Sequence, residues 1–305
     1  MSDSSGDARH QRRRFDEIFS VLSRSEVLGA IWRQVYGTDV PGAATPFSFV
    51  TASELTFIAN QLNIGATHRF LDLACGQGGP GFFVARQTGA SMIGLDSSGA
   101  AITGAIAEAS RRGIGKRTRF LVADAAAVAL ATSSVDAVMS VDALQLIPDR
   151  AAVLANVERM LKPGGRFAFT TWVARRHGEG PPFPVDYSPL LTAAGLMPES
   201  SREPSRWEER ESAVFALIRR NGPRLREEVG ESVATMLLSE AERMPGAYPY
   251  LRRVNVVARK PDTEIAAGSP SAQLETFSSA KPIAHVSPPW PRSRRVQSGA
   301  CSNPV

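Results

Sequence analysis

The middle of the chain alternates short apolar runs with longer amphipathic stretches. Runs rich in Leu, Val, Ile and Phe predict buried strands, and apolar residues spaced three and four apart between these runs predict helices. The predicted strands cover residues 68–74, 91–95, 119–123, 135–141 and 166–171. The predicted helices cover residues 79–88, 98–112 and 149–161. This alternation predicts an α/β fold with a doubly wound, mostly parallel sheet that helices cover on both faces.

The N-terminal region has a helical pattern of its own. Residues 1–50 open with a basic run, after which apolar residues such as Phe15 and Ile18 recur at three- and four-residue spacings. Thr51 and Glu54 have the spacing of a capping box, in which each side chain accepts from the backbone amide of the other residue. We therefore expect a helix that starts after Thr51 and leads into the first strand.

The alternation of strands and helices ends after residue 172. The next expected elements are a loop rich in Gly and Pro, a helix at 187–194, helices over 211–244 with a break at 221–223, and a strand at 250–259. Residues 261–305 are rich in Ser, Pro and Ala and hold few large apolar residues. Such a segment cannot bury enough surface to offset the entropy lost on ordering, so we expect a disordered tail.

The composition is that of a folded protein. The 305 residues are 43% hydrophobic and 21% charged, which excludes a collagen-like, disulfide-rich or wholly disordered chain. The two cysteines, Cys75 and Cys301, are too few for a multi-cysteine zinc site and are typical of a reducing compartment, and we expect no metal site. No stretch is apolar enough to span a membrane, and the first residues lack the apolar core of a secretory signal. We expect a cytoplasmic protein without stable membrane insertion.

A net charge of +5 raises the question of an anionic partner. The arginine clusters at 12–14, 219–220 and 294–295 are dispersed along the chain and lack interleaved aromatic residues. We therefore expect a solvated surface and no nucleic acid partner. Attraction toward a membrane surface that holds a lipophilic substrate is the second alternative. The sequence leaves the oligomeric state open.

The sharpest motif is the run LDLACGQGG at residues 71–79, at the end of the first predicted strand. Glycines there let the backbone approach a ligand closely, and the following helix presents its positive N-terminus. Gly76, Gly78 and Gly81 also satisfy the spacing of a dinucleotide fingerprint, and Asp96 lies about 20 residues beyond Gly76, as that fingerprint requires. The glycines alone therefore leave the class of nucleotide ligand open.

Asp72 and four later segments separate these options. A carboxylate inside the strand repels a pyrophosphate but suits a ligand that carries cationic amino and sulfonium groups. The later segments follow in a set order: GLDSS at 94–98, VADA at 122–125, VDAVMSVD at 135–142 and LKPGG at 161–165. Over residues 70–172 this ensemble resembles the class I S-adenosylmethionine-dependent methyltransferases. The last segment is similar to the branch that acts on small molecules in ubiquinone biosynthesis and antibiotic tailoring.

The resemblance implies S-adenosyl-L-methionine as cofactor and a seven-stranded, Rossmann-like sheet with a helical cap. Asp72, Gly76 and Gly78 match the motif that lines the methionine end of the cofactor in this family. Asp96 matches the carboxylate that accepts hydrogen bonds from the ribose hydroxyls, and Asp124 matches the position that takes the adenine amino group. The other expected cofactor contacts are Ala74, Ser97, Ala125 and Val141.

The expected catalytic residues are Asp142, Gln145 and His177. Many enzymes of this branch carry a Leu-His-His-x-x-Asp arrangement after the fourth strand, whereas residues 144–149 here read LQLIPD. Asp142 can act as a base if it faces the pocket, and a loop hydrogen bond is an equal alternative. Gln145 can orient an acceptor but cannot take a proton. His177 follows the fifth strand in a loop that often covers the substrate in this family, with a solvated loop residue as the alternative.

The sequence thus predicts a methyltransferase that acts on a small aromatic or lipophilic metabolite, as in secondary-metabolite or quinone-like biosynthesis. Its expected parts are an N-terminal helical lid at 1–50, a cofactor-binding core at 51–172, a substrate cap with the final strand at 173–260, and the tail at 261–305. Two other functions stay open. One is a catalytically silent S-adenosylmethionine-binding regulatory partner, and the other is an NAD(P)-dependent oxidoreductase.

Overall fold

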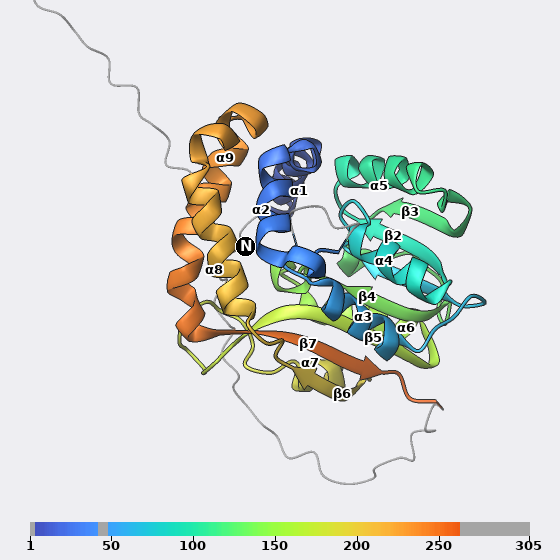
Figure 1. Ribbon diagram of the computed structural model, residues 1–305. Helices are drawn as coiled ribbons and strands as arrows, with labels where there is room; N and C mark the ends of the chain where they lie inside the picture. The colour runs from blue at the N-terminus through green and yellow to red at the C-terminus, as the bar shows by residue number, and fades with distance from the viewer. Residues whose placement is uncertain (1–3, 42–47, 263–305) are drawn as a thin grey trace, which may run out of the picture. The chain divides into compact units, whose positions relative to one another are not determined.

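A mixed β-sheet forms the centre of the structure (Figure 1). The computed structural model describes residues 4–41 and 48–262. Within these residues seven strands pair in the order β3-β2-β1-β4-β5-β7-β6. Strand β7 is antiparallel to both of its neighbours, and the other pairs are parallel. In chain order the strands are β1 (Arg69–Leu73), β2 (Ser91–Asp96), β3 (Thr118–Val122), β4 (Val135–Ser140), β5 (Leu161–Ala174), β6 (Met197–Arg202) and β7 (Leu251–Arg259).

Helices cover both faces of this sheet and also form a separate group beside it (Figure 1). Apolar residues of α3, α4 and α5 pack in one buried cluster on one face, and those of α6 and α7 pack on the other. A third cluster joins α1, α2, α8 and α9 with the end of β5. The helices are α1 (Ser4–Val21), α2 (Glu26–Tyr36), α3 (Ala52–Leu62), α4 (Gly79–Thr88), α5 (Gly99–Arg111), α6 (Arg150–Met160), α7 (Ser188–Ala193), α8 (Trp207–Arg220) and α9 (Gly222–Ala247).

The doubly wound α/β fold predicted from the sequence is confirmed, and so are the local signals that delimit its helices. Thr51 and Glu54 form the predicted capping box at the start of α3. Asp149 accepts a hydrogen bond from the amide of Ala152 at the start of α6. The predicted break near Asn221 separates α8 from α9. Each of these signals is local in the sequence, which is why periodicity and capping residues were sufficient to find it.

Strand β6 was missed by the sequence analysis. All six of its residues are exposed and one of them is Pro198, so neither an apolar run nor an alternation marks the segment. It pairs with β7 alone, at the edge of the sheet, where proline is tolerated. Strand β5 also begins earlier than expected, because Leu161 already pairs with Val135 of β4, and a bulge precedes the pairing of Arg166 with Ala137.

The predicted tail at 261–305 lies, beyond Asp262, outside the described residues. None of the helices described here combines the length and apolar character needed to cross a membrane.

Candidate functional site

The acidic residues singled out by the sequence follow the carboxyl ends of neighbouring strands. Asp96 ends β2, Asp124 follows β3, and Asp142 follows β4, while the glycine turn follows β1. These four strands are parallel and adjacent in the sheet, so the segments meet at one edge. Open α/β sheets bind ligands at this edge.

The turn after β1 is held in conformations that favour glycine. Gly76 and Gly78 have φ of 52° and 83°, and Ala74 adopts a φ of 57°, a region that non-glycine residues rarely enter. A β-carbon on Gly76 would lie 3.1 Å from the ring of Phe19, and one on Gly78 would lie 2.6 Å from the ring of Phe82. The rings of Phe19 and Phe82 thus lie close to where these β-carbons would be, and the positive φ at both positions favours glycine.

Asp96 links this turn to the start of α5. Its Oδ2 accepts a hydrogen bond from the amide of Gly76 at 2.8 Å, and its Oδ1 accepts from the amide of Ser98 at 2.9 Å. The side chain is buried, and burial raises the pKa of Asp96 against the opposing effect of the backbone amides of Ser98, Gly76 and Ser97. Ser97 therefore acts through its backbone next to the carboxylate.

Asp72 lies beneath the turn with an unsatisfied oxygen. The residue is 1% exposed, and its Oδ2 has no hydrogen-bond partner among the described residues. The pKa of Asp72 is raised to about 8. Burial is the largest cause, and the negative charge of Asp96 is the next. Within residues 4–41 and 48–262 no cation forms an ion pair with either carboxylate. Two buried carboxyl groups without a positive partner fit a ligand that brings positive charge to the glycine turn.

The segment after β3 holds the other expected nucleotide contacts. Asp124 is exposed, and its Oδ1 accepts from the amide of Ala126 at 2.9 Å, which caps the short 3-10 helix η4 (Ala125–Ala127). Ala125 is buried and Val141, after β4, is half-buried. All three residues lie on segments that follow adjacent or nearby strands at the same edge.

Helix α1 crosses this edge and contacts three of its loops. Oδ1 of Asp16 accepts from Ser98 Oγ at 2.6 Å and from the amide of Ala100 at 3.2 Å. The carbonyl of Phe19 accepts from Nε2 of Gln77 at 2.9 Å. Nε2 of Gln11 donates to the carbonyl of Leu146, in the segment after β4, at 3.0 Å. The helix is thus fixed to the segments that follow β1, β2 and β4.

Asp142 has partners on both carboxylate oxygens. Its Oδ2 accepts from Ser48 Oγ at 2.8 Å and from the amide of Phe49 at 3.0 Å. Its Oδ1 accepts from Thr170 Oγ1 at 2.7 Å and from Nη1 of Arg253 at 2.5 Å. Burial alone would raise the pKa of Asp142, but the positive charge of Arg253 and the hydroxyl donors outweigh it, so this pKa is lowered. These contacts favour the loop hydrogen-bonding alternative over the role of a base.

Gln145 and His177 lie in different surroundings. Gln145 is buried, its Nε2 donates to the carbonyl of Asp142 at 2.8 Å, and its Oε1 accepts from Thr171 Oγ1 at 3.1 Å. Both polar atoms of its side-chain amide therefore have hydrogen-bond partners within the protein. His177 is exposed on the loop between β5 and α7, next to an ion pair between Arg176 and Glu179. Among the described residues, no hydrogen bond or ion pair joins His177 to the glycine turn.

A buried charged cluster next to Asp142 was missed by the sequence analysis. Arg253 on β7 is 1% exposed and its guanidinium lies 3.4 Å from Glu54 and 3.9 Å from Glu211, in addition to Asp142. Burial alone would lower the pKa of Arg253, but the three carboxylates together outweigh it and raise this pKa. The available signals were an arginine inside a predicted strand and an acidic residue on the apolar side of a helix. Neither signal says which residues will meet.

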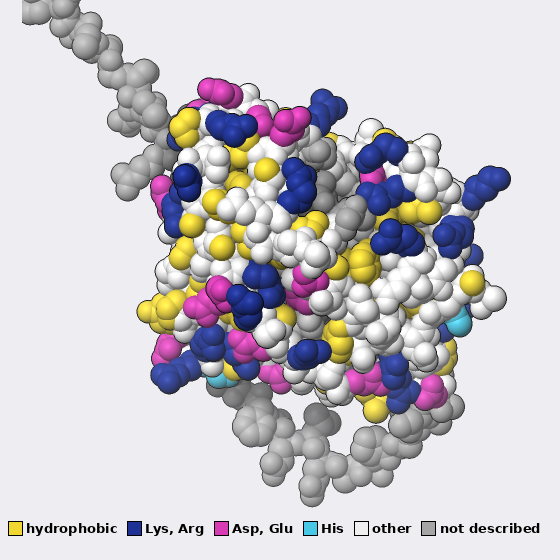
Figure 2. Space-filling model, in the orientation of Figure 1, with side chains coloured by type: hydrophobic (Ala, Val, Ile, Leu, Met, Phe, Trp, Pro, Cys, Tyr) yellow, Lys and Arg dark blue, Asp and Glu magenta, His cyan; other side chains and the backbone are white. Residues whose placement is uncertain are grey.

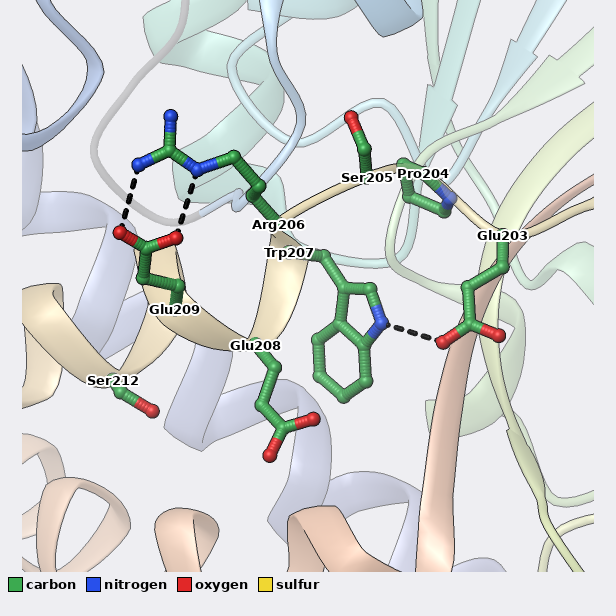
Figure 3. Close-up of a pocket in the computed structure, with 8 residues that line it drawn as sticks. All are labelled: Glu203, Pro204, Ser205, Arg206, Trp207, Glu208, Glu209 and Ser212. Carbon is green, nitrogen blue, oxygen red and sulfur yellow. Dashed lines mark hydrogen bonds and ion pairs between the residues drawn. The ribbon is translucent and has the colours of Figure 1, made fainter.

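A surface depression of about 640 Å³ lies at the start of α8 (Figure 3). Arg206 and Glu209 form an ion pair at its rim, and Nε1 of Trp207 donates to Glu203 at 2.9 Å. None of its lining residues belongs to the glycine turn or to the loops after β2, β3 and β4. The depression is therefore distinct from the expected cofactor site.

Lys and Arg side chains are interspersed with Asp and Glu over the face seen in Figure 2. Charges of both signs in this pattern are typical of a solvated surface. Among the described residues, no three His, Cys, Asp or Glu side chains are grouped as metal ligands would be.

Comparison with known proteins gives a family match over the region that holds the glycine turn and the acidic residues after β2, β3 and β4. The sequence matches the methyltransferase domain family over residues 64–210. It is 34% identical over 115 residues to methyltransferase GfsG of Streptomyces halstedii, which covers 38% of this chain and 41% of GfsG. It is 29% identical over 225 residues to 27-O-demethylrifamycin SV methyltransferase of Amycolatopsis mediterranei, which covers 67% of this chain and 82% of that protein. The chain thus spans less than half the length of GfsG.

The fold has a close counterpart among solved structures. The [4+2]-cyclase SpnF superposes with a TM-score of 0.68 at 19% identity, over 84% of this chain and 97% of SpnF. At this identity the likeness concerns the fold alone.

Proposed function

Because the chain belongs to the class I S-adenosylmethionine-dependent methyltransferases, we propose that it transfers a methyl group from S-adenosyl-L-methionine to a small aromatic or lipophilic metabolite. The cofactor supplies a methyl group on a positively charged sulfur, which an electron-rich acceptor atom can attack. The protein's part is to bind this cation, align the acceptor and exclude water.

The observation that carries this proposal is the pair of buried carboxyl groups at the glycine turn. Asp72 has an unsatisfied oxygen and a pKa raised to about 8, and the pKa of Asp96 is also raised. A ligand with an ammonium and a sulfonium group would offset both carboxylates, whereas a pyrophosphate would add negative charge next to them. The charge of the site therefore supports S-adenosylmethionine over a dinucleotide.

The sheet supports the same choice. Its order places the antiparallel β7 between β5 and β6, whereas dinucleotide-binding sheets of the common order 3-2-1-4-5-6 have no such strand. An NAD(P)-dependent oxidoreductase is thus the weaker alternative.

Each cofactor contact is proposed from the position of its residue. Asp96 would accept from the ribose hydroxyls, and Asp124 would take the adenine amino group beside the backbone of Ala125. The backbones of Ala74, Gly76 and Gly78 would line the methionine end above Asp72, and Ser97 and Val141 would flank the nucleoside. Both oxygens of Asp96 already accept from backbone amides, so its carboxylate is oriented before a ligand binds.

We further propose that the N-terminal region acts as a lid and that residues 173–260 contribute the substrate cap. Helix α1 contacts the segments after β1, β2 and β4, and Phe19 packs on the turn at Gly76. Cofactor entry would therefore require α1 to move, and its return would exclude water from the reacting groups.

Calorimetry with S-adenosylhomocysteine and with NAD, each added to the full chain, tests the cofactor. Binding of S-adenosylhomocysteine is the expected result, and binding of NAD alone would refute the proposal. Incubation with methyl-labelled S-adenosylmethionine and a metabolite extract then tests the transfer.

The labelling experiment also decides between an enzyme and a silent binder. A labelled small molecule in the extract supports transfer and identifies the acceptor. Binding of S-adenosylhomocysteine without any labelled product across extracts would favour the regulatory binding partner. The resemblance to SpnF, named a cyclase, is a reason to make this distinction by experiment.

A further inference from the structure

Four buried polar atoms on one side of the sheet have no hydrogen-bond partner among the described residues. They are Nε1 of Trp172, Oε1 of Glu211, Nη2 of Arg253 and Oδ1 of Asn255. Trp172 lies opposite Arg253 in the pairing of β5 with β7, and Thr170 lies opposite Asn255, so these strand residues share a face. Oε1 of Glu211, from α8, lies 3.9 Å from Nη1 of Arg253. Buried polar atoms without partners are few in native proteins, so a group of four from this face and the adjoining helix fits a bound molecule.

The four atoms define what that molecule offers. Two are donors, on Trp172 and Arg253, and two are acceptors, on Glu211 and Asn255. A hydroxyl group donates and accepts at once, so it can satisfy both kinds. A carboxylate only accepts and an ammonium only donates. The site therefore fits an alcohol or a phenol.

A chain of contacts leads from the surface to this place. The ring of Trp207 lines the depression at the start of α8 (Figure 3). Its centroid lies 5.2 Å from that of Tyr248, whose hydroxyl donates to Oε2 of Glu211 at 3.3 Å. The two rings thus connect the lining of the depression with Glu211 through direct contacts.

We propose that Trp172, Glu211 and Asn255 bind a hydroxyl group of the methyl acceptor, and that Oε1 of Glu211 takes the proton of that hydroxyl. This inference rests on the proposed function. As the proton passes to Glu211, the electron pair of the O–H bond stays on the acceptor oxygen, which forms the bond to the methyl carbon. The carbon–sulfur bond breaks and its electron pair remains on sulfur, which leaves as a neutral thioether. Asp142 and Gln145 do not accept this proton, because their side-chain polar atoms already have hydrogen-bond partners within the protein.

The charges around Glu211 suit this task. Burial raises the pKa of Glu211 to about 8; Asp142 and Glu54 add to the rise, and Arg253 and the hydroxyl of Tyr248 oppose it. Tyr36, from α2, also lies near Glu211: burial raises the pKa of Tyr36, and the charge of Glu211 adds to this rise. Since the carboxyl group is protonated below its pKa, its proton-accepting form increases as pH rises through about 8. A base with a pKa near the working pH is the efficient choice.

A binding experiment tests the site without the natural acceptor. The full chain, labelled with ¹³C at the glutamate side-chain carboxyl carbon and saturated with S-adenosylhomocysteine, is titrated with phenol and followed by NMR. The Glu211 resonance is identified by its loss in Glu211→Gln, a variant that imitates the protonated carboxyl group and keeps an acceptor for Tyr248. We expect phenol to shift this resonance in a saturable way. Binding of S-adenosylhomocysteine with no effect of phenol on Glu211 would refute the inference and leave the proposed function intact.

A kinetic experiment follows once the labelled product has identified the acceptor. We expect kcat of the wild type to rise with pH and level off above about 8, and Glu211→Gln to lose about 100-fold in kcat together with this rise. Glu227→Gln, on the exposed side of α9, is the matched control and should behave as wild type. A Glu211→Gln variant with kcat within about threefold of wild type and the same pH profile would overturn the assignment. Failure of both variants and the wild type to bind S-adenosylhomocysteine would instead count against the proposed function.

Discussion

Nη1 of Arg253 lies 2.5 Å from Oδ1 of Asp142, and both side chains are almost wholly removed from solvent. The pair joins β7 to the loop after β4, residues 111 positions apart in the chain. The same guanidinium reaches Glu54 at the start of α3 and Glu211 on α8. One cation thus holds four elements together at the boundary between the sheet and the neighbouring helices.

Replacing Arg253 should therefore destabilise the protein strongly. Arg253→Met keeps much of the side-chain volume but leaves Asp142 and Glu54 buried without their positive partner, at an expected cost of about 3–5 kcal/mol. Urea denaturation followed by circular dichroism measures the loss. Arg259→Met, on the same strand and at its exposed end, is the control and should change stability far less. Equal midpoints for the two variants would show that the cluster does not stabilise the fold.

Stability should also depend on pH through Asp72. The pKa of Asp72 is about 8 in the folded protein and ordinarily 3.8, so between these values the folded protein holds a proton that the unfolded chain has lost. Its contribution is fully present below pH 3.8 and is lost as pH rises through about 8, by up to about 1.4 kcal/mol per pH unit.

Asp72→Asn removes this ionisation, so the variant should lose less stability than wild type between pH 5 and pH 8. Urea midpoints at intervals across this range provide the measurement. The exposed Glu227→Gln serves as the control and should keep the wild-type slope. Parallel curves for Asp72→Asn and wild type would contradict the raised pKa.

The glycine turn and Asp96 were predictable because their signals are local. A strand end, a helix start and the glycines between them lie within a dozen residues, and the helix break at Asn221 depends on equally local residues. The cluster around Arg253 was not predictable, because its partners Asp142 and Glu54 lie 111 and 199 positions away in the chain. Which charges meet inside a protein depends on strand register and helix packing, and periodicity does not define either.

The partners of the expected catalytic residues were equally hidden in the sequence. Asp142 and Gln145 follow a strand at the edge where ligands bind, so position alone favoured a role in chemistry. Their hydrogen-bond partners, Thr170 and Thr171, come from the neighbouring strand β5, and the pairing that brings them there is set by the sheet. The sequence does not distinguish a polar side chain with hydrogen-bond partners in the protein from one that is available to a ligand.

The contact of α1 with α5 makes a prediction about the lid. Asp16→Ala removes the acceptor of Ser98 Oγ and of the Ala100 amide, a loss comparable to that of a helix cap. We expect the amides of α1 to exchange hydrogen about fivefold faster, the equivalent of ~1 kcal/mol, in mass spectrometry of the free protein. Glu17→Ala, at the adjacent exposed position, is the matched control. Unchanged exchange in Asp16→Ala would mean that other contacts hold α1 on the edge of the sheet.

Asp96 provides the direct test of the cofactor site. Asp96→Ala removes the proposed acceptor of the ribose hydroxyls and also the group that orients the amides of Gly76 and Ser98. Because hydrogen bonds to a charged group contribute about 1.5–3 kcal/mol, we expect calorimetry to find affinity for S-adenosylhomocysteine reduced about 10- to 100-fold. Asp96→Asn keeps one acceptor oxygen and should fall between this variant and wild type. Asp186→Ala, which removes an exposed carboxylate from the loop before α7, is the control and should bind as wild type. Wild-type affinity in Asp96→Ala would mean that the ligand does not contact the end of β2, and the assignment of the whole edge would have to be revised.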